Sequence, residues 1–171
     1  MRLFLAIRME DDMRQALLRC QEEMRRQGVG GHYTKAENLH LTLLFIGEYP
    51  DAEAVGEIAA AVPFPPLSLR LKGIGAFGDL WWAGIEPNEA LERAAARLRH
   101  ALAEAGIPFD RKAFQPHITL VRRAVFPGPG LPDIAVPPAG MRTDHFSLMR
   151  SDRGKDGWVY TEVLRFPGDA P

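Results

Sequence analysis

The stretch Asn38-Leu39-His40-Leu41-Thr42-Leu43-Leu44-Phe45-Ile46-Gly47 alternates polar and apolar side chains and is rich in strand-forming residues, which predicts a β-strand. Because a strand has a side-chain period of two, His40 and Thr42 point to one face and Leu41 and Leu43 to the other. The apolar pair would anchor the strand on a hydrophobic core. The polar pair would line the opposite face.

The same pattern returns in a second predicted strand, Pro116-His117-Ile118-Thr119-Leu120-Val121-Arg122. In each half of the chain, a strand and a long helix precede the histidine strand over nearly the same number of residues, and a further strand follows it. These elements are expected at Leu3–Arg8 and Asp11–Gln27 in the first half, and at Trp81–Ile85 and from Asn88 to Ala105 in the second. Such a repeat predicts two lobes related by approximate two-fold symmetry, with the two histidines meeting across a central cleft.

The other predicted elements complete an α+β fold, with an antiparallel sheet and helices in each lobe, in a single domain covering residues 1–171. They are a helix at Ala52–Ala61, a hairpin of strands at Leu67–Phe77 and Leu80–Ile85, a loop rich in proline and glycine at Pro127–Gly140, and strands at Met141–Met149 and Trp158–Phe166. The tail beyond Pro167 is expected to fray.

Charge and composition limit the classes of function. The net charge is −1, from 21 basic and 22 acidic side chains; this disfavours a protein that coats long nucleic acids but permits a phosphorylated ligand in a locally basic pocket. Basic residues outnumber acidic ones between Arg111 and Lys155; most should form a solvated face, and a minority could steer an anionic substrate.

The single cysteine, Cys20, allows neither a disulfide framework nor a thiolate metal cluster, and is expected in the core. No apolar run is long enough for a signal peptide or a membrane span, so we expect a soluble cytoplasmic protein.

Two imidazoles and two hydroxyls on one face suit the chemistry of a phosphodiester. One histidine can take a proton from the attacking oxygen while the other gives one to the leaving oxygen, because imidazole titrates near neutrality. The hydroxyls of Thr42 and Thr119 can donate to the non-bridging oxygens. Arg122 could hold the phosphate as well, but its odd spacing from His117 requires a strand end or a bend. One His-x-Thr alone could be a polar strand face without function, and the second copy is what favours a site.

The other histidines give no competing site. His32, His100 and His145 are expected to be surface or structural residues. No helical His-x-x-x-His pair and no cysteine cluster is present, so we expect no metal, and no serine lies in a Gly-x-Ser-x-Gly turn.

At this point the sequence resembles the two-histidine phosphoesterase superfamily, and within it the bacterial and archaeal RNA 2′,3′-cyclic phosphodiesterases, historically called 2′-5′ RNA ligases. The resemblance covers nearly the whole chain. It is carried by Arg2-Leu3-Phe4-Leu5-Ala6-Ile7, Glu37-Asn38-Leu39-His40-Leu41-Thr42-Leu43, Phe45-Ile46-Gly47-Glu48, Gly73-Ile74-Gly75-Ala76-Phe77, Phe114-Gln115-Pro116-His117-Ile118-Thr119-Leu120-Val121-Arg122 and Tyr160-Thr161-Glu162-Val163-Leu164-Arg165-Phe166-Pro167.

This resemblance implies a bilobal phosphoesterase fold without metal or other cofactor, and hydrolysis of the 2′,3′-cyclic phosphate at an RNA end to a 2′-phosphomonoester. It implies that His40 is the acid on the departing 3′ oxygen and that His117 activates water. Thr42, Thr119 and Arg122 would then bind phosphate. Phe45 matches an aromatic position that stacks on the nucleobase, although it could equally be a core residue.

The sequence also departs from the family and leaves alternatives open. Tyr33-Thr34-Lys35-Ala36 stands where the family often has an aromatic residue followed by proline, and residues 127–140 do not align with it. The expected partners are RNA ends or nucleotides bearing a 2′,3′-cyclic phosphate, and we expect a monomer. Two alternatives are a non-catalytic module that binds nucleotides or RNA ends, and a phosphodiesterase for small cyclic nucleotides.

Overall fold

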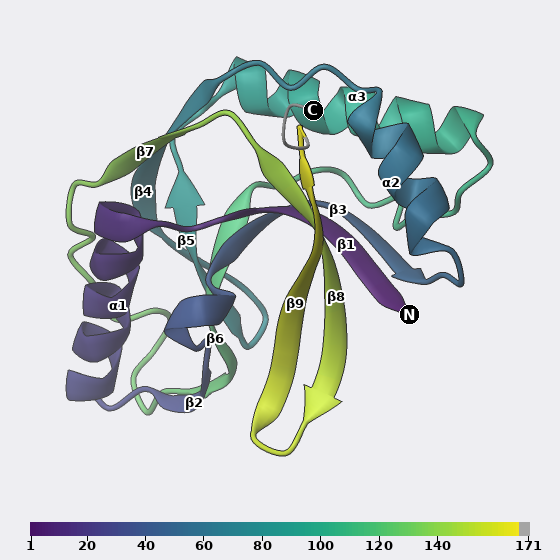
Figure 1. The fold of residues 1–171 in the computed structure, drawn as a ribbon. Coiled ribbons are helices and arrows are strands. Elements are labelled where there is room, and N and C mark those ends of the chain that lie inside the picture. Colours follow the sequence, from purple (N-terminus) through teal and green to yellow (C-terminus); the bar gives the residue numbers. More distant parts are fainter. Residues whose placement is uncertain (168–171) are drawn as a thin grey trace.

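The strands of this chain form one curled antiparallel sheet, which a computed structural model describes together with the helices for residues 1–167 (Figure 1). In chain order the elements are β1 (Arg2–Arg8), α1 (Asp11–Arg26), β2 (Gly30–Tyr33), a 3₁₀ turn (Ala36–Asn38), β3 (His40–Glu48), α2 (Ala52–Ala60), β4 (Leu67–Phe77), β5 (Leu80–Ile85), α3 (Glu89–Glu104), β6 (His117–Val125), β7 (Gly140–Thr143), β8 (Phe146–Gly154) and β9 (Gly157–Phe166). The prediction of an α+β fold is confirmed. The prediction about the tail beyond Pro167 lies outside the described residues.

The strand order is approximately symmetric about the two histidine strands. It runs β7-β4-β5-β6-β3-β1-β8-β9, with β2 paired to β6 off this path. β3 and β6 meet at the centre, where Leu41 pairs with Ile118. Outward from this seam, β1 corresponds to β5, β8 to β4 and β9 to β7, so each histidine strand has the same neighbours in its own half.

The two halves of the sheet are not two continuous pieces of chain. β4 follows β3 in sequence but pairs with β5 in the other half, and β8 follows β6 and β7 but pairs with β1. The long helices also cross over: α1 packs against β6 and β7, and α3 packs against β3. The two halves are therefore connected by the crossing segments of the chain as well as by the pairing of β3 with β6.

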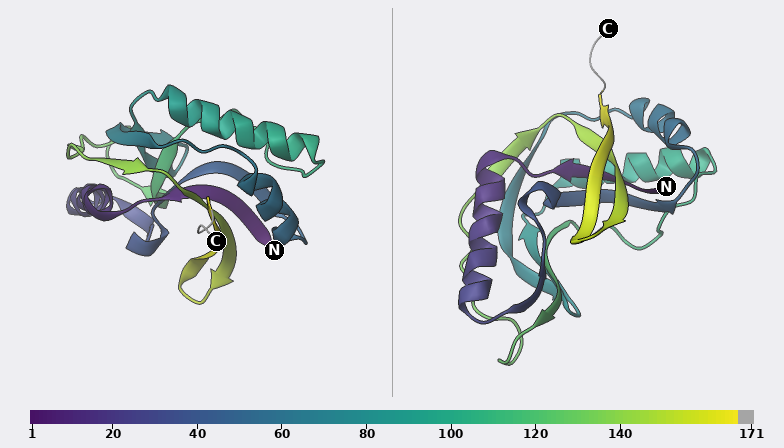
Figure 2. Two further views of the ribbon diagram at one scale, coloured as in Figure 1. Left: turned by 45° about the horizontal axis from the view of Figure 1, so that its top comes forward. Right: turned by 60° about the horizontal axis from the view of Figure 1, so that its bottom comes forward.

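The helices cover one face of the sheet and leave the other for the motifs. Leu3, Leu5 and Ile7 of β1 are fully buried in the main core together with Met13 and Leu17 of α1. α2 and α3 lie together over one end of the sheet and α1 stands at the other, while the β8–β9 hairpin projects away from the body (Figures 1 and 2). Cys20 is buried in this core, as predicted.

Most predicted boundaries are confirmed to within one or two residues, including the Asn88 cap, whose side chain accepts a hydrogen bond from the Leu91 amide at 3.0 Å. The single strand predicted over Met141–Met149 is wrong. The Thr143 hydroxyl donates to the His145 carbonyl at 2.9 Å and accepts from its amide at 3.3 Å, which breaks the strand. The chain then crosses from β4 on one half of the sheet to β1 on the other.

The short strand β2 was not predicted, because Gly30 and Gly31 resemble a turn. Gly31 has a φ of +140°, and a Cβ there would lie 2.9 Å from the carbonyl oxygen of Arg122. The glycines therefore let β2 approach β6 closely.

None of the helices described in residues 1–167 combines the length and apolar character needed to cross a membrane.

Candidate active site

The register of the sheet places the two motifs side by side. β3 and β6 pair antiparallel at the apolar residue that lies between histidine and threonine in each motif. One position along each strand, this register sets His40 opposite Thr119 and His117 opposite Thr42. Opposed residues of an antiparallel pair point to the same face, with their Cβ atoms typically about 4.5–5.5 Å apart. The face without helices therefore gathers two imidazoles and two hydroxyls, as predicted.

A β-bulge in β6 carries Arg122 onto this face. Consecutive residues of β5 pair with Thr119 and Val121, so Leu120 is an extra residue. Leu120 and Val121 are both buried, and the alternation resumes one residue out of phase. Arg122 thus lies on the side of His117 and is exposed. The bend that the odd spacing required is this bulge.

An equivalent bulge in β3 acts on Phe45. Consecutive residues of β1 pair with Leu44 and Thr42, so Leu43 is the extra residue, and both leucines are buried. Phe45 pairs with Phe4 and comes to the site face, where it is half-buried in a small apolar cluster separate from the main core. In the other half of the sheet, its counterpart is the arginine of β6.

Both histidines are oriented in the same way by the backbone. Nδ1 of His40 lies 2.7 Å from the carbonyl oxygen of Asn38, and Nδ1 of His117 lies 2.6 Å from that of Gln115. A carbonyl oxygen only accepts, so each Nδ1 carries the proton and each Nε2 of a neutral ring keeps its lone pair. Nε2 of His40 lies 3.0 Å from the Thr42 hydroxyl, which donates to it when the ring is neutral.

Burial and nearby charge favour the neutral form of both rings. Burial lowers the pKa of His40 to about 4; the hydrogen bond to the Asn38 carbonyl opposes this, and the charges of Arg122, His117 and Arg8 add to it. Burial also lowers the pKa of His117, and Arg122 acts in the same direction. In the free protein, both imidazoles are therefore neutral at neutral pH.

Aromatic rings flank each histidine, and sequence reasoning missed them. The ring centroids of Phe4 and Tyr160 lie 5.1 and 5.2 Å from that of His40. On the other side, Phe77 lies 5.0 Å and Trp82 6.1 Å from His117. Phe4 could have been found, because alternation along β1 puts it on the face opposite Leu3 and Leu5. The other three depend on strand pairings that the sequence does not give.

A buried polar residue of α1 supports the bulge in β6. Nε2 of Gln21 donates to the carbonyl oxygen of Leu120 at 3.0 Å and to that of Thr34 at 2.8 Å. Gln21 is 1% exposed. The amide of Thr34 also donates to Leu120, at 2.9 Å. The bulged carbonyl is thus held from two sides, which fixes the chain just before Arg122.

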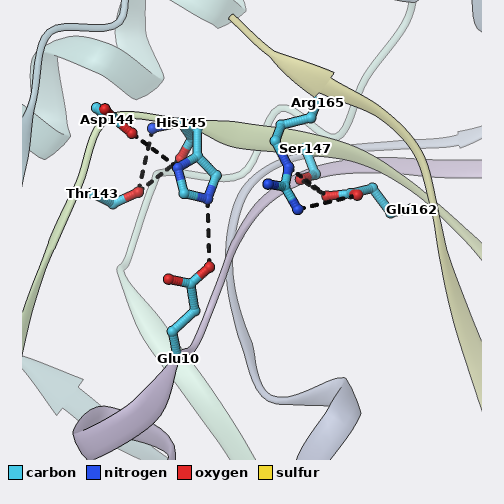
Figure 3. A network of polar contacts seen from close by, with 7 residues as sticks. All are labelled: Glu10, Thr143, Asp144, His145, Ser147, Glu162 and Arg165. Carbon is cyan, nitrogen blue, oxygen red and sulfur yellow. Dashed lines mark hydrogen bonds and ion pairs between the residues drawn. The ribbon is translucent and has the colours of Figure 1, made fainter. Parts of the chain in front are cut away.

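The remaining histidines lie apart from the paired imidazoles or at the margin of their face. His145 lies between Asp144, at 3.0 Å, and Glu10, at 3.5 Å, and so links the loop before β8 to the start of α1 (Figure 3). His100 pairs with Glu104 on the exposed side of α3. His32 is exposed and lies opposite Arg122 in the pairing of β2 with β6. Within residues 1–167, no group of three or more His, Cys, Asp or Glu side chains is placed to hold a metal ion.

Known proteins are similar to this chain in sequence and in fold. The model of the 2′-5′ RNA ligase superfamily matches residues 12–155. The RNA 2′,3′-cyclic phosphodiesterase of Thermus thermophilus is 35% identical over 184 aligned positions, covering 97% of this chain and 89% of the relative. The enzyme of the same name from Thermotoga maritima is 31% identical, covering 94% and 91%.

Solved structures of similar proteins have the same fold. The crystal structure of TT0787 of Thermus thermophilus superposes with a TM-score of 0.77 at 32% identity, covering 99% of this chain and 100% of that one. Escherichia coli LigT complexed with 3′-AMP gives a TM-score of 0.76 at 28% identity, covering 96% and 95%. With a family match over most of its length and both His-x-Thr motifs on one face of this sheet, the chain belongs to the 2′-5′ RNA ligase superfamily.

Proposed function

We propose that this protein is an RNA 2′,3′-cyclic phosphodiesterase, which opens the cyclic phosphate at an RNA end to give a 2′-phosphomonoester. The observation that carries the proposal is the pair of His-x-Thr motifs on one sheet face, with each Nδ1 bound to a backbone carbonyl. The names of the relatives support the substrate class. The complex of LigT with 3′-AMP supports a nucleotide as ligand.

The proposed reaction is an in-line displacement at phosphorus. Nε2 of neutral His117 takes a proton from water as the water oxygen forms a bond to phosphorus. The bond from phosphorus to the 3′ oxygen breaks, and Nε2 of protonated His40 gives that oxygen its proton. His117 ends protonated and His40 neutral, and exchange with solvent restores both. Within residues 1–167, Nε2 of His117 has no hydrogen-bond partner, which suits a base that must accept from water.

The phosphate itself helps to set the protonation states. A phosphodiester anion between the rings favours imidazolium, so binding should raise the pKa of His40 from its low value in the free protein. Thr42, Thr119 and Arg122 would donate to the non-bridging oxygens, and the guanidinium would offset charge in the transition state. Phe45 would stack on the terminal base.

We further propose that no metal takes part. The motif side chains and Arg122 offer imidazole, hydroxyl and guanidinium groups, whereas Mg²⁺ and Ca²⁺ prefer carboxylate and carbonyl oxygens. Both motifs come from one chain, which supports a monomer as the active form, and an RNA substrate supports the expected cytoplasmic location.

One experiment separates this function from its alternatives. The protein is incubated, with chelator present, with an RNA oligonucleotide ending in a 2′,3′-cyclic phosphate and with a 2′,3′-cyclic mononucleotide, and the products are resolved by chromatography. We expect the oligonucleotide to yield only the 2′-phosphomonoester. Binding without hydrolysis would indicate a non-catalytic module, and hydrolysis of the mononucleotide alone would indicate a small cyclic nucleotide as substrate. Activity that chelator abolishes and a divalent ion restores would contradict the metal-independent mechanism.

A further inference from the structure

A line of stacked arginines and aromatic rings leads away from the His40 side of the site. The guanidinium carbon of Arg2 lies 4.9 Å from the ring centroid of Phe45 and 5.3 Å from that of Trp158. The guanidinium carbon of Arg153 lies 5.1 Å from the Trp158 centroid. We name these four residues, from Phe45 through Arg2 and Trp158 to Arg153, the arginine–aromatic strip.

The strip lies on the same face as the histidines. Phe45 pairs with Phe4, whose ring contacts His40. Trp158 pairs with Arg153 across the β8–β9 hairpin. Two residues further along β9, the Tyr160 ring lies 5.2 Å from His40 and shares the face of Trp158 because strand side chains alternate. The strip therefore begins beside the catalytic pair and runs out along the projecting hairpin seen in Figure 1.

The positive charge of the strip is available to a ligand. Both Arg2 and Arg153 are exposed, and within residues 1–167 neither forms an ion pair with an acidic side chain. By contrast, Arg150 on the opposite face of β8 pairs with Asp152 at 2.9 Å. Stacking holds a guanidinium by its face and leaves the N–H groups in its plane free for phosphate oxygens. Cationic side chains interleaved with aromatic rings are typical of surfaces that bind single-stranded nucleic acid.

The hairpin that carries the strip is anchored next to His40. Nδ2 of Asn38 donates to the carbonyl oxygen of Trp158 at 3.0 Å, while the carbonyl of Asn38 accepts from Nδ1 of His40. Asn38 is 8% exposed. One residue thus fixes both the outer part of the strip and the orientation of the acid.

The direction of the reaction determines where the rest of the RNA lies. If His40 protonates the departing 3′ oxygen, the ribose lies on the His40 side and the attacking water on the His117 side. The chain that continues from that ribose toward its 5′ end then leaves over the His40 half of the sheet. We propose, resting on the function above, that the arginine–aromatic strip binds this upstream RNA strand, with Arg2 and Arg153 contacting backbone phosphates and Trp158 holding both guanidiniums in place.

The test compares two substrates and two matched variants. Steady-state constants are measured for a cyclic mononucleotide and for a short RNA ending in the same 2′,3′-cyclic nucleotide, at several salt concentrations. Arg153→Gln should raise KM for the RNA about tenfold, as expected for one charged hydrogen bond. It should also reduce the slope of log affinity against log salt by about 0.7, the value for one phosphate of a single strand. Constants for the mononucleotide should not change.

Arg150→Gln is the control, since it removes the same charge from the opposite face of the same strand. Trp158→Leu should act like Arg153→Gln, because it removes the ring that orients both arginines. An equal effect of Arg153→Gln on both substrates, or an equal effect of Arg150→Gln on the RNA, would overturn the proposal. Unchanged RNA constants in all three variants, with wild-type hydrolysis intact, would overturn the strip but leave the phosphodiesterase function standing. If the wild-type protein hydrolysed neither substrate, the proposed function would fail and this proposal with it.

Discussion

His40 and His117 each bind the backbone carbonyl two residues earlier in the chain, and both imidazoles are partly withdrawn from solvent. The effect of this burial should be visible in the pH dependence of the reaction. Burial lowers the pKa of both rings, to about 4 for His40. In the free enzyme, His40, the proposed acid, therefore loses its proton at a pH below the usual imidazole pKa of about 6.5. We expect kcat/KM to fall as the pH rises with a limb below pH 6.5, and the corresponding limb of kcat to lie higher because bound phosphate favours imidazolium.

The pH dependence of kcat/KM in an Arg122 variant tests whether charge lowers the pKa of the histidines. The charge of Arg122 lowers the pKa of both histidines, so Arg122→Gln should move the limb of kcat/KM to higher pH. A limb above pH 6.5 in the wild-type protein, or one that Arg122→Gln leaves in place, would contradict this electrostatic description.

Arg122 should also matter for the rate itself. In the proposed mechanism its guanidinium contacts the non-bridging oxygens, where charge rises in the transition state, so Arg122→Ala should lower kcat by about 10²–10³-fold, as for a lost oxyanion donor. Arg122→Lys should recover only part, because an ammonium cannot make the two-pronged contact. The quantity to measure is kcat under saturating substrate.

The next residue provides the control for Arg122. Arg123 lies at a second bulge of β6, where the pairing with β2 is shifted, and it has a φ of +52°. It therefore stands outside the alternation that brings Arg122 to the site face. Arg123→Ala should therefore change kcat little. A damaging Arg123→Ala together with a mild Arg122→Ala would assign the phosphate contact to the other arginine.

At the level of strands and helices, the sequence predicts which side chains share a face where a strand alternates regularly. It does not predict the bulges and hydrogen bonds that interrupt the alternation. The common face of His40 and Thr42 follows from a period of two. The places of Phe45 and Arg122 do not, because each follows a bulge whose extra residue is an ordinary leucine. The predicted strand at Met141–Met149 fails for a related reason, since a local side-chain hydrogen bond splits a run that is otherwise typical of one strand.

The bulge in β6 can be tested through the residue that holds it. Gln21→Met keeps the approximate size of the side chain but removes both hydrogen bonds to the carbonyls of Thr34 and Leu120. The Leu120 carbonyl would keep only the Thr34 amide as donor and the Thr34 carbonyl would lose the Gln21 amide, which should lower the free energy of unfolding by about 1–3 kcal/mol. Chemical denaturation measures this, and kcat should fall as well because the bulge places Arg122. Gln15→Met, an exposed position on the same helix, should change neither, and equal effects of the two variants would contradict the role of Gln21.

For the whole molecule, the near two-fold order of strands explains how one small chain brings two histidines in equivalent positions together on one face. The symmetry ends at the flanks: Phe45, Arg2 and the β8–β9 hairpin lie beside His40, whereas Phe77 and Trp82 lie beside His117. The sequence repeat predicts the pairing of the histidines. It does not predict that β4 and β8 exchange halves, because that depends on how long connections cross the sheet.

The stability of the folded molecule should depend on pH through His40. Its pKa is about 4 in the fold and about 6.5 in an unfolded chain. Between these values the unfolded state binds more protons, so the contribution of neutral His40 is complete above pH 6.5 and is lost as the pH falls toward 4. Melting temperatures measured across this range should fall less steeply for His40→Gln than for the wild-type protein. A His40→Gln curve parallel to the wild-type curve would disprove this linkage.

The most direct test of the paired-histidine mechanism is a single-turnover comparison of two oligonucleotide substrates with wild-type protein, His40→Ala and His117→Ala. One substrate is the natural 2′,3′-cyclic phosphate, and in the other sulfur replaces the bridging 3′ oxygen, so that the leaving group needs no proton. Both variants should lose about 10²–10⁴-fold on the natural substrate. On the sulfur substrate, His40→Ala should recover most of its rate and His117→Ala should remain slow. Recovery of His117→Ala in place of His40→Ala would reverse the two roles, and near wild-type rates for both variants on the natural substrate would contradict the mechanism.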